Sequence, residues 1–147
     1  MLDLNNDEKQ LNAALEALHF GFRALTAQPD SRLARVGYSR IHHRILFFIG
    51  RNPACSISEL LEIMRITKQY LHGPLQRLIE DGYIQVKSDS SDRRMKRLSL
   101  SRKGKDFENK LSGDQREIFK QVFMKAGPQA EDGWRKVMDL LAKSWDE

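Results

Sequence analysis

The chain has 147 residues, of which 40% are hydrophobic and 31% are charged, and its formal net charge is +5. This length predicts one domain with a modest core, and the single cysteine, Cys55, excludes an intramolecular disulfide framework and a cysteine-based zinc finger. No apolar run approaches the ~18 residues of a membrane span, and the acidic, polar N-terminus is unlike a signal peptide. We therefore expect a cytoplasmic protein that makes no membrane contact.

Positive charge is concentrated in one segment of the chain. Residues 65–105 contain eleven basic and four acidic side chains, whereas residues 1–64 are balanced and residues 106–147 carry a net charge of −2. A solvated helix face normally mixes charges of both signs, so this excess is typical of a surface that binds the phosphates of a nucleic acid.

Two helices are predicted before the basic segment. Residues 8–27 have apolar side chains three and four positions apart, which indicates an amphipathic helix. Residues 29–37 contain Pro, Asp, Ser and Gly, and we interpret them as a loop. A second helix is expected over residues 39–49, with Ser39 as its N-cap and Arg51-Asn52-Pro53 as its end.

Two more helices follow in quick succession. Ser56 and Glu59 have the spacing of a capping box, in which Ser56 accepts from the Glu59 amide and the Glu59 side chain reaches back. Only Arg65-Ile66 separates this short helix from Thr67, a second N-cap, whose helix runs to about Glu80. A two-residue connection of this kind is typical of a helix-turn-helix motif.

The apolar period then changes from about 3.6 to about 2 residues. Residues 83–87 and 96–101 alternate as strands do, and residues 88–95 between them are polar and turn-forming, which predicts a hairpin. A hairpin directly after a helix-turn-helix is a wing. Ser101 then caps a long helix that runs to Ala126, and Gly127-Pro128 separates it from a terminal helix.

Four segments carry a family pattern: residues 56–61, 78–84, 92–94 and 98–104. Asp92-Arg93-Arg94 matches the D-x-R wing element of the MarR family of bacterial transcription regulators, and residues 98–104 are similar to its L-T-x-x-G ending. The chain therefore resembles this family from Ser39 to Gly104. The resemblance implies a dimer with intertwined terminal helices and two lobes on a pseudo-palindromic operator. It also implies that a small ligand, often aromatic or phenolic, or an oxidant weakens DNA binding.

The order of these elements predicts a mainly α fold with a small β-hairpin. We divide it into an N-terminal dimerisation helix and loop (residues 1–38), a winged helix-turn-helix DNA-binding lobe (39–104) and C-terminal dimerisation helices (105–147). The apolar stripes on the flanking helices are too broad for a monomer of this size, which favours a homodimer.

Arg94 in the wing is the first candidate contact. The resemblance places it in the DNA minor groove, where negative potential is focused, with Asp92 beside it to hold the arginine through a charge-assisted contact. The alternative is a solvated loop with a chance Asp–Arg pair that contributes little, and the surrounding hairpin favours the functional interpretation. Arg93, Lys96 and Arg97 face phosphates or solvent equally well.

The start of the second motif helix supplies the candidates for base contacts. They are Thr67, Lys68, Gln69, Tyr70 and His72. Gln69 suits adenine, and Lys68 suits guanine or a phosphate. Ser56 and Ser58 at the start of the first motif helix suit a phosphate, although capping alone explains them at least as well.

Gly73-Pro74 lies inside this second helix, where it departs from the family pattern. An internal proline removes one hydrogen bond and clashes with the preceding turn, at a cost of about 3 kcal/mol. Either the helix kinks between Tyr70 and Pro74, or it begins at Pro74 with Gly73 as its cap. Because Thr67 and the short turn mark the earlier start, we favour a kink that re-aims the base-reading side chains.

Ligand and metal sites are less sharply indicated. Aromatic side chains at Phe20, Phe22, Tyr38 and Trp134 line either a ligand pocket or the core, with core the commoner outcome; the named ligand candidates are Phe22, Arg23, Tyr38 and His42. The adjacent His42 and His43 point about 100° apart on a helix, so we expect no metal site. No cofactor is expected, and Cys55 is interpreted as structural or incidental.

Taken together, these patterns favour a homodimeric transcription regulator, acting as a repressor, that binds double-stranded DNA and is relieved by a small aromatic or phenolic effector. The alternative is a winged-helix module that binds protein or RNA without ligand control. An enzyme has little support, because the sequence contains no glycine-rich phosphate loop, HExxH motif or nucleophile elbow.

Overall fold

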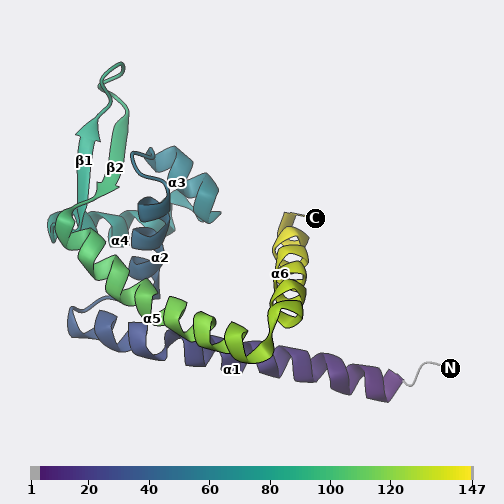
Figure 1. Cartoon of the computed structure of the whole chain (residues 1–147). Helices are drawn as coiled ribbons and strands as arrows, with labels where there is room; N and C mark the ends of the chain where they lie inside the picture. Colours follow the sequence, from purple (N-terminus) through teal and green to yellow (C-terminus); the bar gives the residue numbers. More distant parts are fainter. Residues whose placement is uncertain (1–3, 147) are drawn as a thin grey trace.

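Figure 1 shows a computed structural model of the chain, which describes residues 4–146. Residues 1–3 and 147, at the outer ends of the two predicted dimerisation segments, lie outside the described part. The elements are α1 (Leu4–Arg35), α2 (Arg40–Arg51), α3 (Ile57–Met64), α4 (Lys68–Glu80), β1 (Ile84–Ser88), β2 (Lys96–Leu100), α5 (Arg102–Ala126), α6 (Pro128–Lys143) and the 3-10 helix η1 (Ser144–Asp146). The predicted mainly α fold with one hairpin is confirmed.

The hydrophobic core lies in the lobe built from α2, α3, α4, the hairpin and the first half of α5, closed below by the end of α1 (Figure 1). Each of these elements contributes aliphatic side chains that are almost fully buried: Leu33, Ile45, Leu46, Ile49, Leu60, Leu71, Leu78, Leu98 and Leu111. Burial of one such side chain contributes about 1.5–3 kcal/mol, so packing within the lobe supplies most of its stability.

The first helix is longer than predicted. α1 continues to Arg35, so the interpretation of residues 29–37 as a loop is wrong for residues 29–35. Pro29 offers no amide hydrogen to the carbonyl of Leu25 one turn earlier, but the side-chain amide of Gln115 in α5 donates to that carbonyl at 3.3 Å. Pro29 and Leu33 are also fully buried. A contact from a distant helix thus compensates for the proline.

The predicted N-caps are confirmed at four helices. Ser39 precedes α2, and the hydroxyls of Ser56, Thr67 and Ser101 accept from the amides three residues ahead. One detail differs, because the carboxylate of Glu59 accepts a hydrogen bond from Arg97 at 3.2 Å, an interaction that the capping-box prediction did not include.

α4 begins where Thr67 predicts. α4 runs without interruption from Lys68 to Glu80 with Pro74 inside it, so the alternative start at Pro74 is wrong. Leu71, Leu75 and Leu78 bury one side of α4 in the core. The kink proposed at Gly73-Pro74 stays a prediction.

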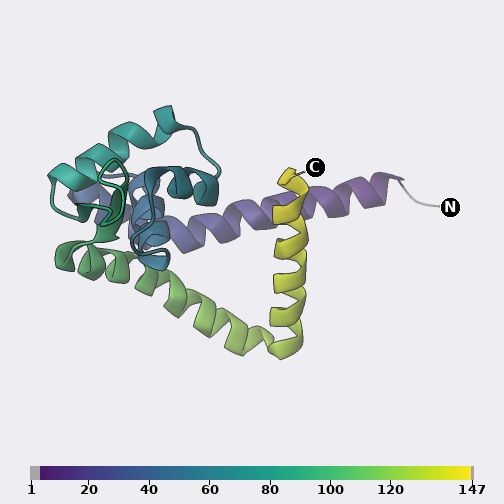
Figure 2. The same cartoon turned by 90° about the horizontal axis from the view of Figure 1, so that it is seen from above.

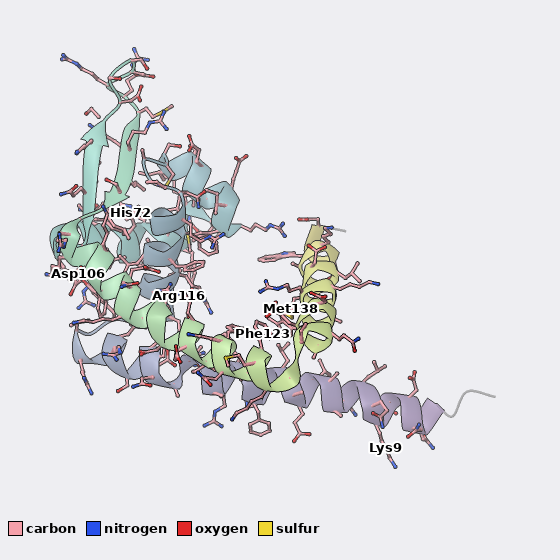
Figure 3. All side chains as sticks on the ribbon, viewed as in Figure 1. Lys9, His72, Asp106, Arg116, Phe123 and Met138 are labelled. Atoms are coloured by element: carbon pink, nitrogen blue, oxygen red, sulfur yellow. The ribbon has the colours of Figure 1, made fainter. Side chains whose placement is uncertain are left out.

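The rest of α1, the second half of α5 and α6 lie outside the lobe and form an open scaffold beside it. Seen from above, α1, α5 and α6 lie along the three sides of a triangle (Figure 2). The corner between α5 and α6 is closed by Phe119, Phe123 and Trp134, whose ring centroids lie 5.1–5.4 Å apart, and Figure 3 shows Phe123 and Met138 near this corner. Trp134 therefore packs between helices. None of the helices within residues 4–146 is long and apolar enough to cross a membrane.

The first turn of α5 packs against the start of the hairpin at Gly104, where an added Cβ would lie 2.0 Å from the carbonyl oxygen of Tyr83. We expect Gly104→Ala to lower the free energy of unfolding by about 1–3 kcal/mol, because the backbone on one side must move. Urea denaturation measures this, with Gly113→Ala as control, since a Cβ there meets only the Arg116 side chain at 3.8 Å. Equal stability of the two variants would contradict the packing described.

Candidate nucleic-acid interface

The first turns of α4 present polar side chains to solvent. Lys68, Gln69, Tyr70 and His72 are exposed, whereas Leu71 between them is 1% exposed and holds the helix to the core. The hydroxyl of Thr67 accepts from the Tyr70 amide at 3.2 Å, so it serves as the cap. These are the side chains that an element entering the major groove would offer to base edges.

The hairpin is anchored to the lobe through backbone pairing. β1 and β2 are antiparallel, with Ile84 opposite Leu100 and Ser88 opposite Lys96. Leu98 of β2 also exchanges two backbone hydrogen bonds with the segment before α3, donating to Cys55 at 2.8 Å and accepting from Ala54 at 2.9 Å. Three paired segments at the base therefore fix the direction in which the wing projects (Figure 1).

Asp89 organises the tip of the wing. Its Oδ2 accepts from the Ser91 hydroxyl at 2.6 Å and from the Ser91 and Asp92 amides at 3.2 and 3.1 Å. Its Oδ1 accepts from Arg97 at 3.2 Å. The bonds from Ser91 and Arg97 stabilise the charged carboxylate and lower the pKa of Asp89 to about 2.

Arg97 connects the wing to the helix-turn-helix. Beside its bond to Asp89, its guanidinium lies 3.2 Å from the Glu59 carboxylate on α3 and donates to the Ala54 carbonyl at 3.3 Å. A guanidinium with three internal acceptors has few donors left for DNA. Arg97 was predicted to face phosphates or solvent, and its placement favours a structural role.

The D-x-R element is arranged differently from the expectation. Oδ1 of Asp92 accepts from the backbone amide of Arg94 at 3.0 Å, so the carboxylate holds the turn and leaves the Arg94 side chain unpaired. Within residues 4–146, neither Arg93 nor Arg94 forms an ion pair, and both are exposed. Two exposed guanidinium groups without an ion pair within residues 4–146 therefore lie at the tip of the wing.

The two serines at the start of α3 differ in exposure. Ser56 is 7% exposed and its hydroxyl accepts from the Glu59 amide at 3.1 Å, which favours the capping role. Ser58 is exposed and remains available for a phosphate.

An aromatic and ionic cluster fixes the far end of α4. The Tyr38 hydroxyl donates to Asp81, and the guanidinium of Arg77 lies 4.8 Å above the Tyr38 ring. Burial, followed by the bond to Asp81, raises the pKa of Tyr38, so the phenol keeps its proton. Arg77 also donates to the Gly37 carbonyl at 2.8 Å. α4 is thereby tied to the corner between α1 and α2.

The four ligand candidates do not gather in one place. His42 is stacked on Tyr38 at 4.4 Å, and its Nδ1 accepts from the Ser39 amide at 3.0 Å, so it serves the start of α2. Phe22 lines a cavity of about 270 Å³ between α1, α2 and α5. Tyr38 lines a different hollow beside Tyr70, and Arg23 borders neither.

The cavity at Phe22 has an aromatic wall and a charged rim. Its lining residues include Phe22, Phe47, Phe48, Arg40, Arg44 and His43. Arg40 lies 4.9 Å from the Phe22 ring centroid and 2.9 Å from Asp30. Sequence reasoning missed Arg40 and Phe47, and their spacing on one helix face next to Phe22 gave only a weak signal. It also missed Asp89, whose role depends on Arg97 across the hairpin.

Comparisons with known proteins agree with this geometry. Residues 36–95 match the sequence model of the MarR family. The chain is 37% identical over 134 residues to the HTH-type transcriptional regulator PetP of Rhodobacter capsulatus, covering 91% of this chain and 81% of PetP.

Two solved structures share the fold. Streptococcus pneumoniae FabT in complex with DNA has a TM-score of 0.79 and 17% identity, covering 95% of this chain and 97% of FabT. Bordetella bronchiseptica BpsR, whose DNA binding is regulated by 6-hydroxynicotinic acid, has a TM-score of 0.67 and 19% identity, covering 90% of this chain and 98% of BpsR.

The Asp89 network predicts a distinct acid titration. Because folding lowers this pKa from 3.8 to about 2, the charged Asp89 stabilises the wing above about pH 4, and that contribution disappears as the pH falls towards 2. Carboxyl NMR should give a midpoint near 2, and Arg97→Gln should raise it towards 3.8, whereas Arg93→Gln should leave it unchanged. A wild-type midpoint near 3.8 would refute the network.

Proposed function

Because the chain belongs to the MarR family of transcription regulators, we propose that it is a homodimeric repressor that binds a pseudo-palindromic operator and releases it when a small ligand binds. The observation that carries the proposal is the pairing, on one lobe, of an exposed recognition-helix start with a wing whose tip presents Arg93 and Arg94 unpaired. The start of α4 is polar, the wing tip is positively charged, and both elements are attached to the core of the lobe.

The helices outside the lobe support the homodimer. On α1, Leu11, Leu15 and Leu18 are 51–67% exposed, and on α6, Val137, Leu140 and Leu141 are 50–63% exposed. α6 buries none of its own residues in the single chain. Apolar area left in water on this scale costs about 25 cal/mol per Å², so a second copy packed against α1, α5 and α6 is favoured.

A dimer of this kind presents two lobes to DNA. The start of α4 would enter the major groove of each half-site, with half-sites about one helical turn, or ~34 Å, apart. Lys68, Gln69, Tyr70 and His72 are the proposed base and phosphate contacts, with Ser58 on a neighbouring phosphate. Thr67 and Ser56 cap their helices and support these contacts.

The wing supplies the minor-groove contact in this proposal. The Arg94 guanidinium enters the narrow groove, and Arg93 faces a phosphate. Asp92 and Asp89 hold the turn, and Arg97 holds the wing to α3, so the backbone that carries the arginine loses little conformational freedom on binding.

The cavity at Phe22 is the proposed effector site. Phe22 and Phe47 offer faces for an aromatic ring, and Arg44 offers a charge for a carboxylate or phenolate, next to Arg40, which is paired with Asp30. BpsR, which shares this fold, responds to an aromatic acid of this chemistry. Because the cavity lies where α2 of the lobe meets α1 and α5, a ligand there would change the angle between the lobe and the scaffold.

Arg94→Ala tests the DNA contact. We expect operator affinity to fall by about 1–3 kcal/mol, roughly 5- to 150-fold, and the slope of log K against log salt to lose about one phosphate equivalent or less. Fluorescence anisotropy on an operator selected from random DNA measures both. The control Arg35→Ala removes the same charge from an exposed side chain at the end of α1, outside the basic segment 65–105.

Two results would count against this function. An unchanged affinity in Arg94→Ala would remove the wing from the interface. A wild-type protein that sediments as a monomer and prefers RNA to DNA would instead favour the alternative function of a winged-helix module.

A thermal-shift screen with benzoate- and nicotinate-type acids tests the effector site. We expect at least one acid to raise the Tm and to weaken operator binding, because a ligand that binds the folded protein stabilises it. Phe47→Ala should abolish both effects, whereas Leu140→Ala on α6, away from the cavity, should keep the Tm response to the acid. Persistence of both effects in Phe47→Ala would place the effector elsewhere.

A further inference from the structure

Arg65 joins the turn of the helix-turn-helix to the far end of the chain. Its Nη1 lies 3.1 Å from Oδ1 of Asp146, and its Nη2 lies 3.2 Å from Oδ2, which is the two-point geometry of a guanidinium on a carboxylate. Its Cζ also lies 5.6 Å from the ring centroid of Trp145. Both partners belong to η1, which follows α6 directly.

The backbone at Arg65 is unusual for an arginine. Arg65 is the C-cap of α3 and adopts φ 55° and ψ 46°, the left-handed region that favours glycine or asparagine. Within residues 4–146, Ala54 is the only other residue besides glycines with a positive φ. The left-handed backbone is strained for an arginine, and the side chain of Arg65 makes contacts that a glycine would lack.

The path of α6 brings η1 back to the lobe. Gly127, with φ 94°, separates α5 from α6, and the cluster of Phe119, Phe123 and Trp134 fixes the angle between the two helices. α6 then rises from the end of α5 to the level of α3 (Figure 1). The contact at Arg65 therefore closes a ring that runs from the lobe through α5 and α6 and back to the lobe.

We propose that Arg65, Trp145 and Asp146 form a strut that holds the helix-turn-helix at a fixed orientation to the C-terminal helix and so positions α4 for DNA. The inference rests on the proposed DNA-binding function. Arg65 lies two residues before Thr67, the N-cap of α4, so a displacement of its backbone reaches the base-reading turn directly. The strut limits the motion of each lobe before binding, and less freedom is then lost when two lobes engage one operator.

The expected effect is modest because the contact is partly exposed to solvent. The side chains of Arg65 and Asp146 are 44% and 59% exposed, and exposed ion pairs and cation–π contacts are individually weak. Loss of both contacts should weaken operator binding by about 3- to 10-fold, with the dimer and the Tm unchanged.

Asp146→Asn tests the strut by the direction in which the affinity for DNA changes. Removing a negative charge strengthens DNA binding if only general electrostatics act, whereas the strut predicts weaker binding. The matched control is Asp139→Asn on α6, which makes the same charge change at a side chain whose ion pair, among the described residues 4–146, is with Lys143, 3.0 Å away on the same helix. Weakening in Asp146→Asn alone supports the strut. Affinity equal to or above that of the wild type overturns it.

A double-mutant cycle and hydrogen exchange complete the experiment. If Arg65 acts through Asp146, the double variant Arg65→Ala/Asp146→Asn should bind operator DNA no more weakly than Arg65→Ala, and additive losses overturn the strut.

Independently of DNA, the backbone amides of residues 62–70 should exchange hydrogen faster in Asp146→Asn than in Asp139→Asn, and equal rates overturn the strut. A wild-type protein that binds no DNA contradicts the proposed function, while the exchange rates still decide the strut.

Discussion

The backbone pairing between Leu98 and the Ala54-Cys55 segment is the constraint on which the interface depends. It attaches the wing to the segment that leads into α3, and it places Arg97 where one guanidinium contacts both Asp89 at the wing tip and Glu59 on α3. The burial of Cys55 that accompanies this pairing raises the pKa of its thiol, which keeps the side chain protonated and favours a structural role. Wing and helix-turn-helix consequently form one body.

Pro29 inside α1 shows how a tertiary contact overrides a local preference. Pro29 leaves the Leu25 carbonyl without its helical donor, and Gln115 of α5 replaces it. The same helix pair is joined by Arg32 and Asp114, whose Nε and Oδ2 atoms lie 2.7 Å apart. These contacts sit beside the cavity proposed for the effector, so the geometry of α1 there depends on the position of α5.

Local patterns predicted the elements and most of their ends, because a cap or a strand depends on residues close together in sequence. Ser56, Thr67 and Ser101 were identified in this way, and so was the hairpin. The continuation of α1 past Pro29 and the role of Asp89 could not be predicted, because both depend on side chains from other elements. The candidate ligand residues were divided by packing for the same reason. The aromatic character of Phe22, Tyr38 and His42 did not reveal that Tyr38 and His42 are stacked on each other.

The close approach of Gly104 to Tyr83 has a mechanical consequence. With no room between the start of α5 and the base of the hairpin, the wing cannot rotate independently of that helix. α5 then acts as a lever, with the lobe at one end and the scaffold at the other. In the proposed dimer, the distance between the two wing tips would depend on the angle between the two α5 helices. A small rotation there would be amplified along the length of the helix before it reaches the wing tip.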